Sequence, residues 1–313
     1  AGTWTNTIST DVPSGQGFAK SFKLDCTTAN ASLSSGSYMT LQHRIEAQNL
    51  QYIKKGTANA ESLTLSFWVK SAKTGTYIAY LKDDDNNRDI SKSYTISSAN
   101  TWEKKTVTFP PDTTGAFNND NGIGLYIYFW LVAGSTYLSN NSSSLQTAWA
   151  SSANSAAGQV NLADSTSNDW YITGVQLETG TTESDFEFLP IEVDLQRCQR
   201  YYQKLTGSYA QHGQISNVHY NGTGQAQGVY TYPVKMRATP TLSHTTTSSN
   251  NSSSAYVVAA NGGTDFIDSL ALYNANNHST LIYTNVGGAG TSGHGGNLSV
   301  QSAITEAALV AEL

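Results

Sequence analysis

Charged residues are scarce in this chain, and their scarcity excludes several classes of protein. Asp, Glu, Lys and Arg together make up 13% of the 313 residues. The 17 Lys and Arg residues are scattered and the formal net charge is -6, so no basic stripe could neutralise nucleic-acid phosphates or bind anionic lipid. No apolar run approaches the roughly 18 residues of a membrane-spanning helix. We therefore expect no nucleic-acid partner and no insertion into a membrane.

Cysteine is also scarce. Cys26 and Cys198 are too few and too far apart for a disulfide framework or a zinc site. We interpret both as free, mostly buried thiols, because lone cysteines usually behave as small apolar residues. This fits assembly in a reducing cytoplasm. The chain begins with Ala1 rather than Met, which suggests processing or a fragment.

Blocks of Glu, Lys and Leu with a helical period are nearly absent, whereas residues that suit strands and turns are abundant. The sequence contains 18 Tyr, 9 Phe and 6 Trp, which pack well on pleated surfaces. Ser, Thr, Asn and Gly fill much of the remainder and suit the polar turns between short strands. The composition therefore predicts an all-β protein.

Residues 1–188 are predicted to form one β-sandwich. Leu63–Lys70 and Thr76–Leu81 have strand patterns and are separated by turn residues, so we expect these two strands to pair with each other. Gly124–Val132 is the most apolar run and is predicted to be a central core strand. Trp170–Glu178 is predicted to be the strand that closes the sandwich.

Residues 189–204 are predicted to be a short linking helix, because Ile191, Leu195 and Cys198 fall on one helical face. Strand patterns return after residue 204, in Gly228–Tyr232 and Thr280–Tyr283 among others. We therefore expect residues 205–313 to form a second, smaller β-sandwich domain.

One region of the chain resembles a known family. The stretch Trp170–Gly180, then Phe186–Glu187 and Leu195–Tyr202, resembles a recurrent junction in tail and fibre proteins of tailed bacteriophages. Pro233–Thr241 is similar to the family's element in the following domain, and Ala311–Leu313 is similar to its usual chain end. The similarity covers roughly Trp170 to Leu242 and the terminus.

The resemblance implies a jelly roll like that of carbohydrate-binding modules, followed by a small β-domain. It also implies a structural component of the virion, assembled in the host cytoplasm, often as a homotrimer with other virion proteins as partners. It supplies no catalytic residues. The position of the protein on the head or the tail of the particle stays open.

Aromatic side chains are the best candidates for contact with a glycan, because Tyr and Trp rings stack on sugar rings. We single out Trp149, Trp130 and Tyr128, together with Tyr126. Residues 133–169 lack any clear period and are predicted to be a long surface loop, which would expose Trp149. Packing in the core is the alternative for each of these rings.

No metal site or cofactor is expected from the sequence. The six histidines show no metal-ligand spacing. Asp83, Asp85 and Asp89 offer oxygen ligands that a structural calcium ion would accept, but Arg88 and Tyr94 break the helix-loop-helix calcium pattern. A solvated hairpin turn is the preferred interpretation, and an irregular calcium site is the alternative.

The chain is not expected to be an enzyme. The Gly-x-Ser-x-Gly pattern of a nucleophile elbow is missing, and no pair of carboxylates can be oriented from the sequence for glycoside hydrolysis. The resemblance to phage tail and fibre proteins instead implies a virion protein, in a fibre, knob or decoration, that presents loops to host-surface glycans. The alternatives are a purely architectural virion protein without glycan binding and a virion-borne glycan hydrolase.

Overall fold

The computed structural model describes residues 1–138, 144–151, 156–205, 213–221, 224–246, 256–260, 263–267, 269–286, 291–300 and 304–312. Antiparallel strands dominate these residues, so the prediction of an all-β sandwich protein is confirmed. The chain divides into two compact units between Phe188 and Leu189, and each unit is described by itself. None of the helices in the described residues is long and apolar enough to cross a membrane.

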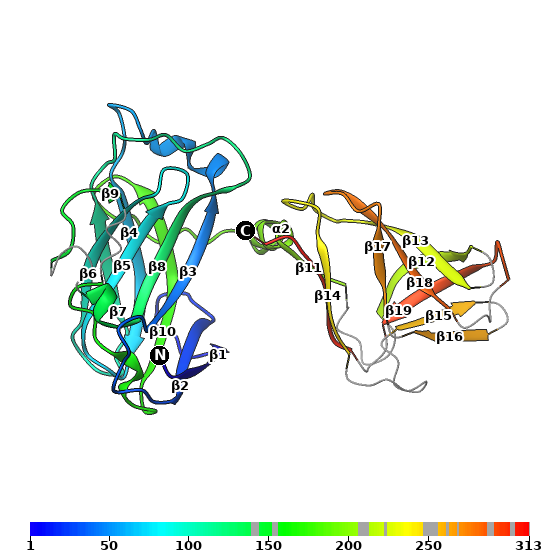
Figure 1. Cartoon of the computed structure of the whole chain (residues 1–313), viewed down its shortest axis with the longest axis horizontal. Helices are drawn as coiled ribbons and strands as arrows, with labels where there is room; N and C mark the ends of the chain where they lie inside the picture. Colours follow the sequence, from blue (N-terminus) through cyan, green and yellow to red (C-terminus); the bar gives the residue numbers. More distant parts are fainter. Residues whose placement is uncertain are drawn as a thin grey trace. The chain divides into compact units, whose positions relative to one another are not determined.

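The first unit is a jelly-roll sandwich of two five-stranded sheets, whose strands are visible in Figure 1. One sheet has the order β1 (Thr3–Ser9), β2 (Ser21–Thr28), β10 (Asp169–Thr179), β4 (Leu63–Ser71) and β7 (Glu103–Phe109). The other has the order β3 (Tyr38–Glu46), β8 (Ile123–Ala133), β5 (Gly75–Asp83), β6 (Arg88–Ile96) and β9 (Ala150–Ser151). A 3-10 helix, η1 (Ala47–Ile53), follows β3, and η2 (Leu162–Asp164) precedes β10.

Alternation along the strands builds the core between the two sheets. Phe67 of β4 contacts Phe129 of β8 edge-to-face at 4.9 Å between ring centroids, and Trp170 of β10 lies 5.9 Å from Phe129. All three side chains are buried. Buried aromatic pairs of this geometry are worth about 0.5–1.5 kcal/mol beyond the area they bury, so they help to fix how the two sheets stack.

The expected pairing of the strands at residues 63–70 and 76–81 is wrong. β4 pairs with β10 and β7 in one sheet, whereas β5 pairs with β6 and β8 in the other. The turn between β4 and β5 therefore crosses from one sheet to the other instead of closing a hairpin. Both strands have one face in the shared core, and the sequence pattern of a strand is the same in either sheet.

The second unit contains a seven-stranded and a three-stranded sheet. The first has the order β16 (Gly263–Ile267), β15 (Tyr256–Ala260), β19 (Gly295–Val300), β12 (Gly213–Tyr220), β13 (Gln225–Thr231), β18 (Ser279–Asn285) and β17 (Ala271–Tyr273). The three-stranded sheet has the order β11 (Tyr202–Lys204), β20 (Ile304–Val310) and β14 (Thr241–Thr246). Buried residues of both sheets, among them Tyr220, Ile282 and Leu309, form one core.

The linking helix is shorter than predicted. Helix α2 spans Ile191–Gln199, and the chain then enters β11. Tyr202–Lys204 pair with Ala308–Val310 of β20, so the hydrogen bonds of the sheet replace those of a helix at these residues. No residue of α2 is buried, and Cys198 is exposed while Cys26 is buried. The expectation of buried thiols therefore holds for Cys26 and is wrong for Cys198.

The segment 133–169 is more than a surface loop in its described part. It contains the short helix α1 (Ser135–Leu138), β9 and η2, and several of its residues are buried. Trp149 is 8% exposed, belongs to the main core, and donates a hydrogen bond from Nε1 to the carbonyl oxygen of Pro110 at 2.8 Å. Residues 139–143 and 152–155 of the predicted loop lie outside the described residues.

A buried cluster of charges joins several loops at one end of the sandwich. The Lys55 ammonium lies 2.6 Å from Asp83 and 3.0 Å from Asp112, and the Arg88 guanidinium binds both oxygens of Asp112 at 2.7 and 2.9 Å. Burial alone would raise the pKa of Asp112, but the hydrogen bonds from Arg88 and Lys55 outweigh it and hold that pKa below 3.8. Asp112 therefore stays ionised at neutral pH.

The first prediction concerns acid stability. Because the pKa of Asp112 is lowered in the folded state, its contribution is present above the ordinary Asp value of 3.8 and is lost as the pH falls through the lowered value. Asp112→Asn should lower the free energy of unfolding at pH 7 by about 3 kcal/mol and flatten its fall in acid. Urea titrations followed by tryptophan fluorescence test this, since all six Trp residues precede Phe188. Asp185→Asn, at an exposed position, is the control.

The second prediction tests the position of Trp149. Trp149→Ala should lower the free energy of unfolding by about 3–5 kcal/mol, because it empties a core site and leaves the Pro110 carbonyl without its donor. The same urea titration of Tyr52→Ala, at a side chain that is 51% exposed, should change that free energy by less than about 1 kcal/mol. Similar values for the two variants would contradict a core position for Trp149.

Candidate functional site

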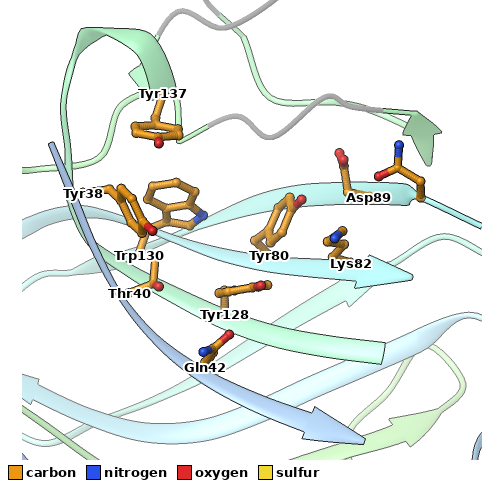
Figure 2. A pocket seen from close by; sticks show the side chains of 10 residues that line it. Tyr38, Thr40, Gln42, Tyr80, Lys82, Asp89, Tyr128, Trp130 and Tyr137 are labelled. Carbon is orange, nitrogen blue, oxygen red and sulfur yellow. The ribbon is translucent and has the colours of Figure 1, made fainter. Parts of the chain in front are cut away.

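A groove with a volume of about 490 Å³ crosses the outer face of the sheet β3-β8-β5-β6. The described residues that line it come from four strands, the turn before β6 and the helix α1, and their side chains are drawn in Figure 2. They are Tyr38, Thr40, Gln42, Tyr80, Lys82, Asn87, Asp89, Tyr128, Trp130 and Tyr137. A volume of this size lies in the range of small-molecule sites, roughly 300–1,000 Å³.

The period-two alternation of β8 places the groove on the outer face. Ile127, Phe129 and Leu131 point into the core, so Tyr128 and Trp130 must point away from it. The strands β3 and β5, which pair with β8 on either side, then place further side chains next to these two. Tyr128 is paired with Gln42 of β3 and Tyr80 of β5, and Trp130 is paired with Thr40 of β3.

Aromatic rings form the floor and one wall of the groove. Trp130 and Tyr80 are 3% and 4% exposed and form the floor, whereas Tyr38 is 56% exposed. The ring centroid of Trp130 lies 5.2 Å from that of Tyr137 and 6.2 Å from that of Tyr38. The ring centroids of Tyr80 and Tyr128 lie 5.3 Å apart. Figure 2 shows Tyr38, Trp130 and Tyr137 gathered at one end of the groove. This end is a rigid aromatic surface.

The opposite end of the groove is polar. Lys82 donates to Asp84 at 2.9 Å, and its Nζ lies 5.4 Å from the ring of Tyr126. The buried carboxylate of Asp89 accepts a hydrogen bond from Nε2 of Gln146 at 3.2 Å. The other end of the same amide, Oε1 of Gln146, accepts from the backbone N–H of Ser91 at 3.0 Å. Gln146 therefore ties residues 144–151 to β6 at this end.

The hydroxyls of Tyr80 and Tyr128 remain protonated at neutral pH. Burial raises the pKa of Tyr80 far above its ordinary value, and the neighbouring Asp89 carboxylate adds to this rise. Burial also raises the pKa of Tyr128 to about 12, with a smaller contribution from Tyr126. Both hydroxyls therefore act as neutral hydrogen-bonding groups and not as bases.

The groove has the groups for binding a ligand and lacks a pair of acids. Tyr38 and Tyr128 offer ring surface, and Gln42 and Thr40 offer hydrogen-bonding groups beside them. Among the ten described lining residues Asp89 is the one carboxylate, whereas hydrolysis of a glycosidic bond uses two. The arrangement suits the binding of a ligand that has both apolar ring faces and hydroxyl groups.

The structure brings together two of the four aromatic residues singled out in the sequence as candidates for ligand contact. Trp130 and Tyr128 line the groove, and Tyr126 stacks on Tyr128 at 5.4 Å but is not among the lining residues. Trp149 lies apart, in the core, so its position does not support a contact with a ligand. Its polar sequence surroundings hid this, because the Pro110 carbonyl that binds its indole is distant in the sequence.

The sequence pattern did not identify four of the groove residues, namely Tyr38, Gln42, Tyr80 and Tyr137. The alternation of side chains along residues 38–46 and 75–83 could have indicated them, because residues two apart lie on the same face of a strand. One face carries Tyr38, Thr40 and Gln42 in β3, and one carries Tyr80 and Lys82 in β5. The pairing of β3, β8 and β5 was needed to join these faces, and the sequence did not provide it.

The alternative of a calcium ion at Asp83, Asp85 and Asp89 does not fit the structure. Residues 84–87 form the turn between β5 and β6, as the preferred interpretation expected. Asp83 binds Lys55, Asp85 accepts hydrogen bonds from the backbone and side chain of Asn118, and Asp89 faces the groove. Among the residues that the structure describes, no three His, Cys, Asp or Glu side chains form a metal cluster.

Solved structures similar to this chain share low sequence identity with it. The enzymatically active domain of tailspike protein 4 of bacteriophage CBA120 is 17% identical over 57% of this chain, with a TM-score of 0.30. A putative sugar binding protein from Bacteroides thetaiotaomicron is 12% identical over 57% of this chain and 83% of its own, with a TM-score of 0.31. A family 11 carbohydrate-binding module of a Clostridium thermocellum cellulase is 13% identical over 58% of this chain and 84% of its own, with a TM-score of 0.27.

These similarities do not carry a function across to this chain. The chain spans 18% of the length of the tailspike chain, and all three TM-scores are too low to support an argument about ligands. No protein-family model matches the chain, and a comparison with curated proteins finds no match. The groove itself is therefore the basis for a functional proposal.

Proposed function

We propose that the chain is a non-catalytic structural protein of a tailed-phage virion that binds a host-surface glycan in the groove of its first unit. The observation that carries the binding proposal is the row of side chains that faces outward from the centre of a β-sheet. Tyr128 and Tyr80 lie side by side in this row with Gln42, where a sheet facing only water would carry small polar residues.

The chemistry of the groove matches that of a sugar chain. The faces of a sugar ring are apolar and its edge carries hydroxyls, so a ring that stacks on Tyr128 can turn its hydroxyls toward Gln42 and Asp89. The groove is open across several strands of one sheet, which suits a chain of sugars better than a single enclosed molecule.

The virion role rests on the sequence resemblance of Trp170–Tyr202 and Pro233–Thr241 to phage tail and fibre proteins. On this proposal the protein is assembled in the host cytoplasm, joins other virion proteins and associates with copies of itself as a homotrimer. Several copies in one particle would multiply a weak binding site, because linked sites bind with greater avidity than single ones.

The third prediction tests the groove. The full chain should bind on an array of bacterial surface oligosaccharides, and Tyr128→Ala should weaken the best hit about tenfold, corresponding to roughly 1.4 kcal/mol of lost stacking. Titration calorimetry with that oligosaccharide measures the loss. Tyr52→Ala, which removes an exposed tyrosine on η1, should bind like the unaltered chain. Unchanged affinity in Tyr128→Ala would place any glycan site elsewhere.

The fourth prediction tests self-association. Light scattering of the purified chain should give a mass three times the 33.5 kDa of one chain. A trimer that binds no oligosaccharide on the array would favour the purely architectural alternative. A strict monomer would contradict self-assembly in isolation and would point to a decoration module or to an assembly that needs a partner protein.

A further inference from the structure

Four oxygen atoms converge on one buried ammonium group at the end of the sandwich. Lys55 Nζ lies 2.6 Å from Oδ2 of Asp83 and 3.0 Å from Oδ2 of Asp112. It also donates to the main-chain carbonyl oxygens of Thr114 and Gly115, each at 2.8 Å. The side chain of Lys55 is 3% exposed, and those of Asp83 and Asp112 are 0% and 4% exposed. We call these four oxygens the Lys55 cage.

The surroundings of the Lys55 cage are apolar on one side and balanced in charge on the other. Nζ lies 5.4 Å from the ring of Phe117 and 5.8 Å from the ring of Trp149, which exclude water. Arg88 binds the second carboxylate and also donates to the carbonyl oxygen of Trp149 at 3.1 Å. Two carboxylates thus face two cations, and removal of either cation would leave two buried carboxylates with one cation.

The Lys55 cage has the composition of a hard-cation site. Carboxylate and main-chain carbonyl oxygens are the ligands that calcium takes in proteins, at about 2.3–2.6 Å. Here the same kinds of oxygen surround an ammonium group at hydrogen-bond distances, 2.6–3.0 Å. A divalent cation cannot share this space with Nζ. Asp83, which suggested a calcium site in the sequence, therefore belongs to a cage that the side chain of Lys55 already occupies.

We propose that Lys55 is a built-in replacement for a structural metal ion in this sandwich, and that loss of its side chain would convert the cage into a calcium site. The unaltered protein then takes no calcium here and is indifferent to chelators. The ammonium joins the end of β5, the segment 112–115 and the chain after η1, which are the connections that a bound ion would make.

The cage also supports the polar end of the groove. Asp83 accepts hydrogen bonds from the backbone and side chain of Asn86, next to the groove residue Asn87, and Arg88 precedes the groove residue Asp89. Lys55 acts on the groove through these neighbours and touches no ligand there. It is a positioning residue, and it is therefore best tested by stability and calcium binding.

The fifth prediction compares melting temperatures of the full chain by tryptophan fluorescence, which reports on residues 1–188. The unaltered chain should melt at the same temperature in EDTA and in CaCl2. Lys55→Ala in EDTA should melt about 10 °C lower, and CaCl2 should raise its melting temperature by about 5 °C or more. Calcium titrated into Lys55→Ala in a calorimeter should give a saturable binding signal.

Two further variants make the outcome decisive. Lys55→Met keeps the bulk and removes the charge, so it should be destabilised without rescue by CaCl2. Lys104→Ala, which removes an exposed lysine 3.9 Å from Glu183, should melt like the unaltered chain under both conditions. A calcium-dependent melting temperature of the unaltered chain would overturn the proposal. So would equal rescue of Lys55→Met, or a folded Lys55→Ala that binds no calcium.

Discussion

The two faces of strand β8 are the constraint on which the rest of the first unit depends. Ile127, Phe129 and Leu131 hold the strand on the core, and the pleat then sends Tyr128 and Trp130 to the other side. A shift of one residue in the register would exchange the two sets and expose the core side chains. The packing that stabilises the sandwich therefore also fixes where the aromatic groove lies, and the aromatic residues between the core positions explain why this run is apolar throughout.

The Lys55 cage has a similar double role at the polar end of the groove. The Lys55 ammonium and the Arg88 guanidinium neutralise Asp83 and Asp112, and Arg88 also donates a hydrogen bond to the carbonyl oxygen of Trp149. Gln146 then ties the neighbouring segment to Asp89 and Ser91. A rigid sheet thus carries the aromatic surface, while a buried charge cluster and one amide hold the loops beside it. Such support keeps a binding surface preorganised, which limits the entropy lost on binding.

Local pattern was enough for the fold class and for the strands at residues 63–70, 76–81, 124–132 and 170–178, because alternation and turn residues are properties of neighbours in the sequence. Local pattern failed at residues whose structure depends on a partner that is distant in the sequence. Tyr202–Lys204 continue a helical pattern but pair with β20, and β4 and β5 look like a hairpin but enter different sheets. Trp149 looks exposed among Ser, Ala and Thr, yet it reaches Pro110 and the core.

Trp130 and Tyr128 were found because their chemistry is unusual at any position, whereas Tyr38 and Gln42 needed the register of β3 against β8.

The most direct test of a glycan site in the groove is a crystal structure of the full chain with the best-binding oligosaccharide from the array. The account predicts a sugar ring stacked on Tyr128, with hydroxyl groups directed toward Gln42 and the Asp89 end of the groove. An oligosaccharide bound at another surface of the first unit, or on the second unit, with the groove unaltered, would contradict it.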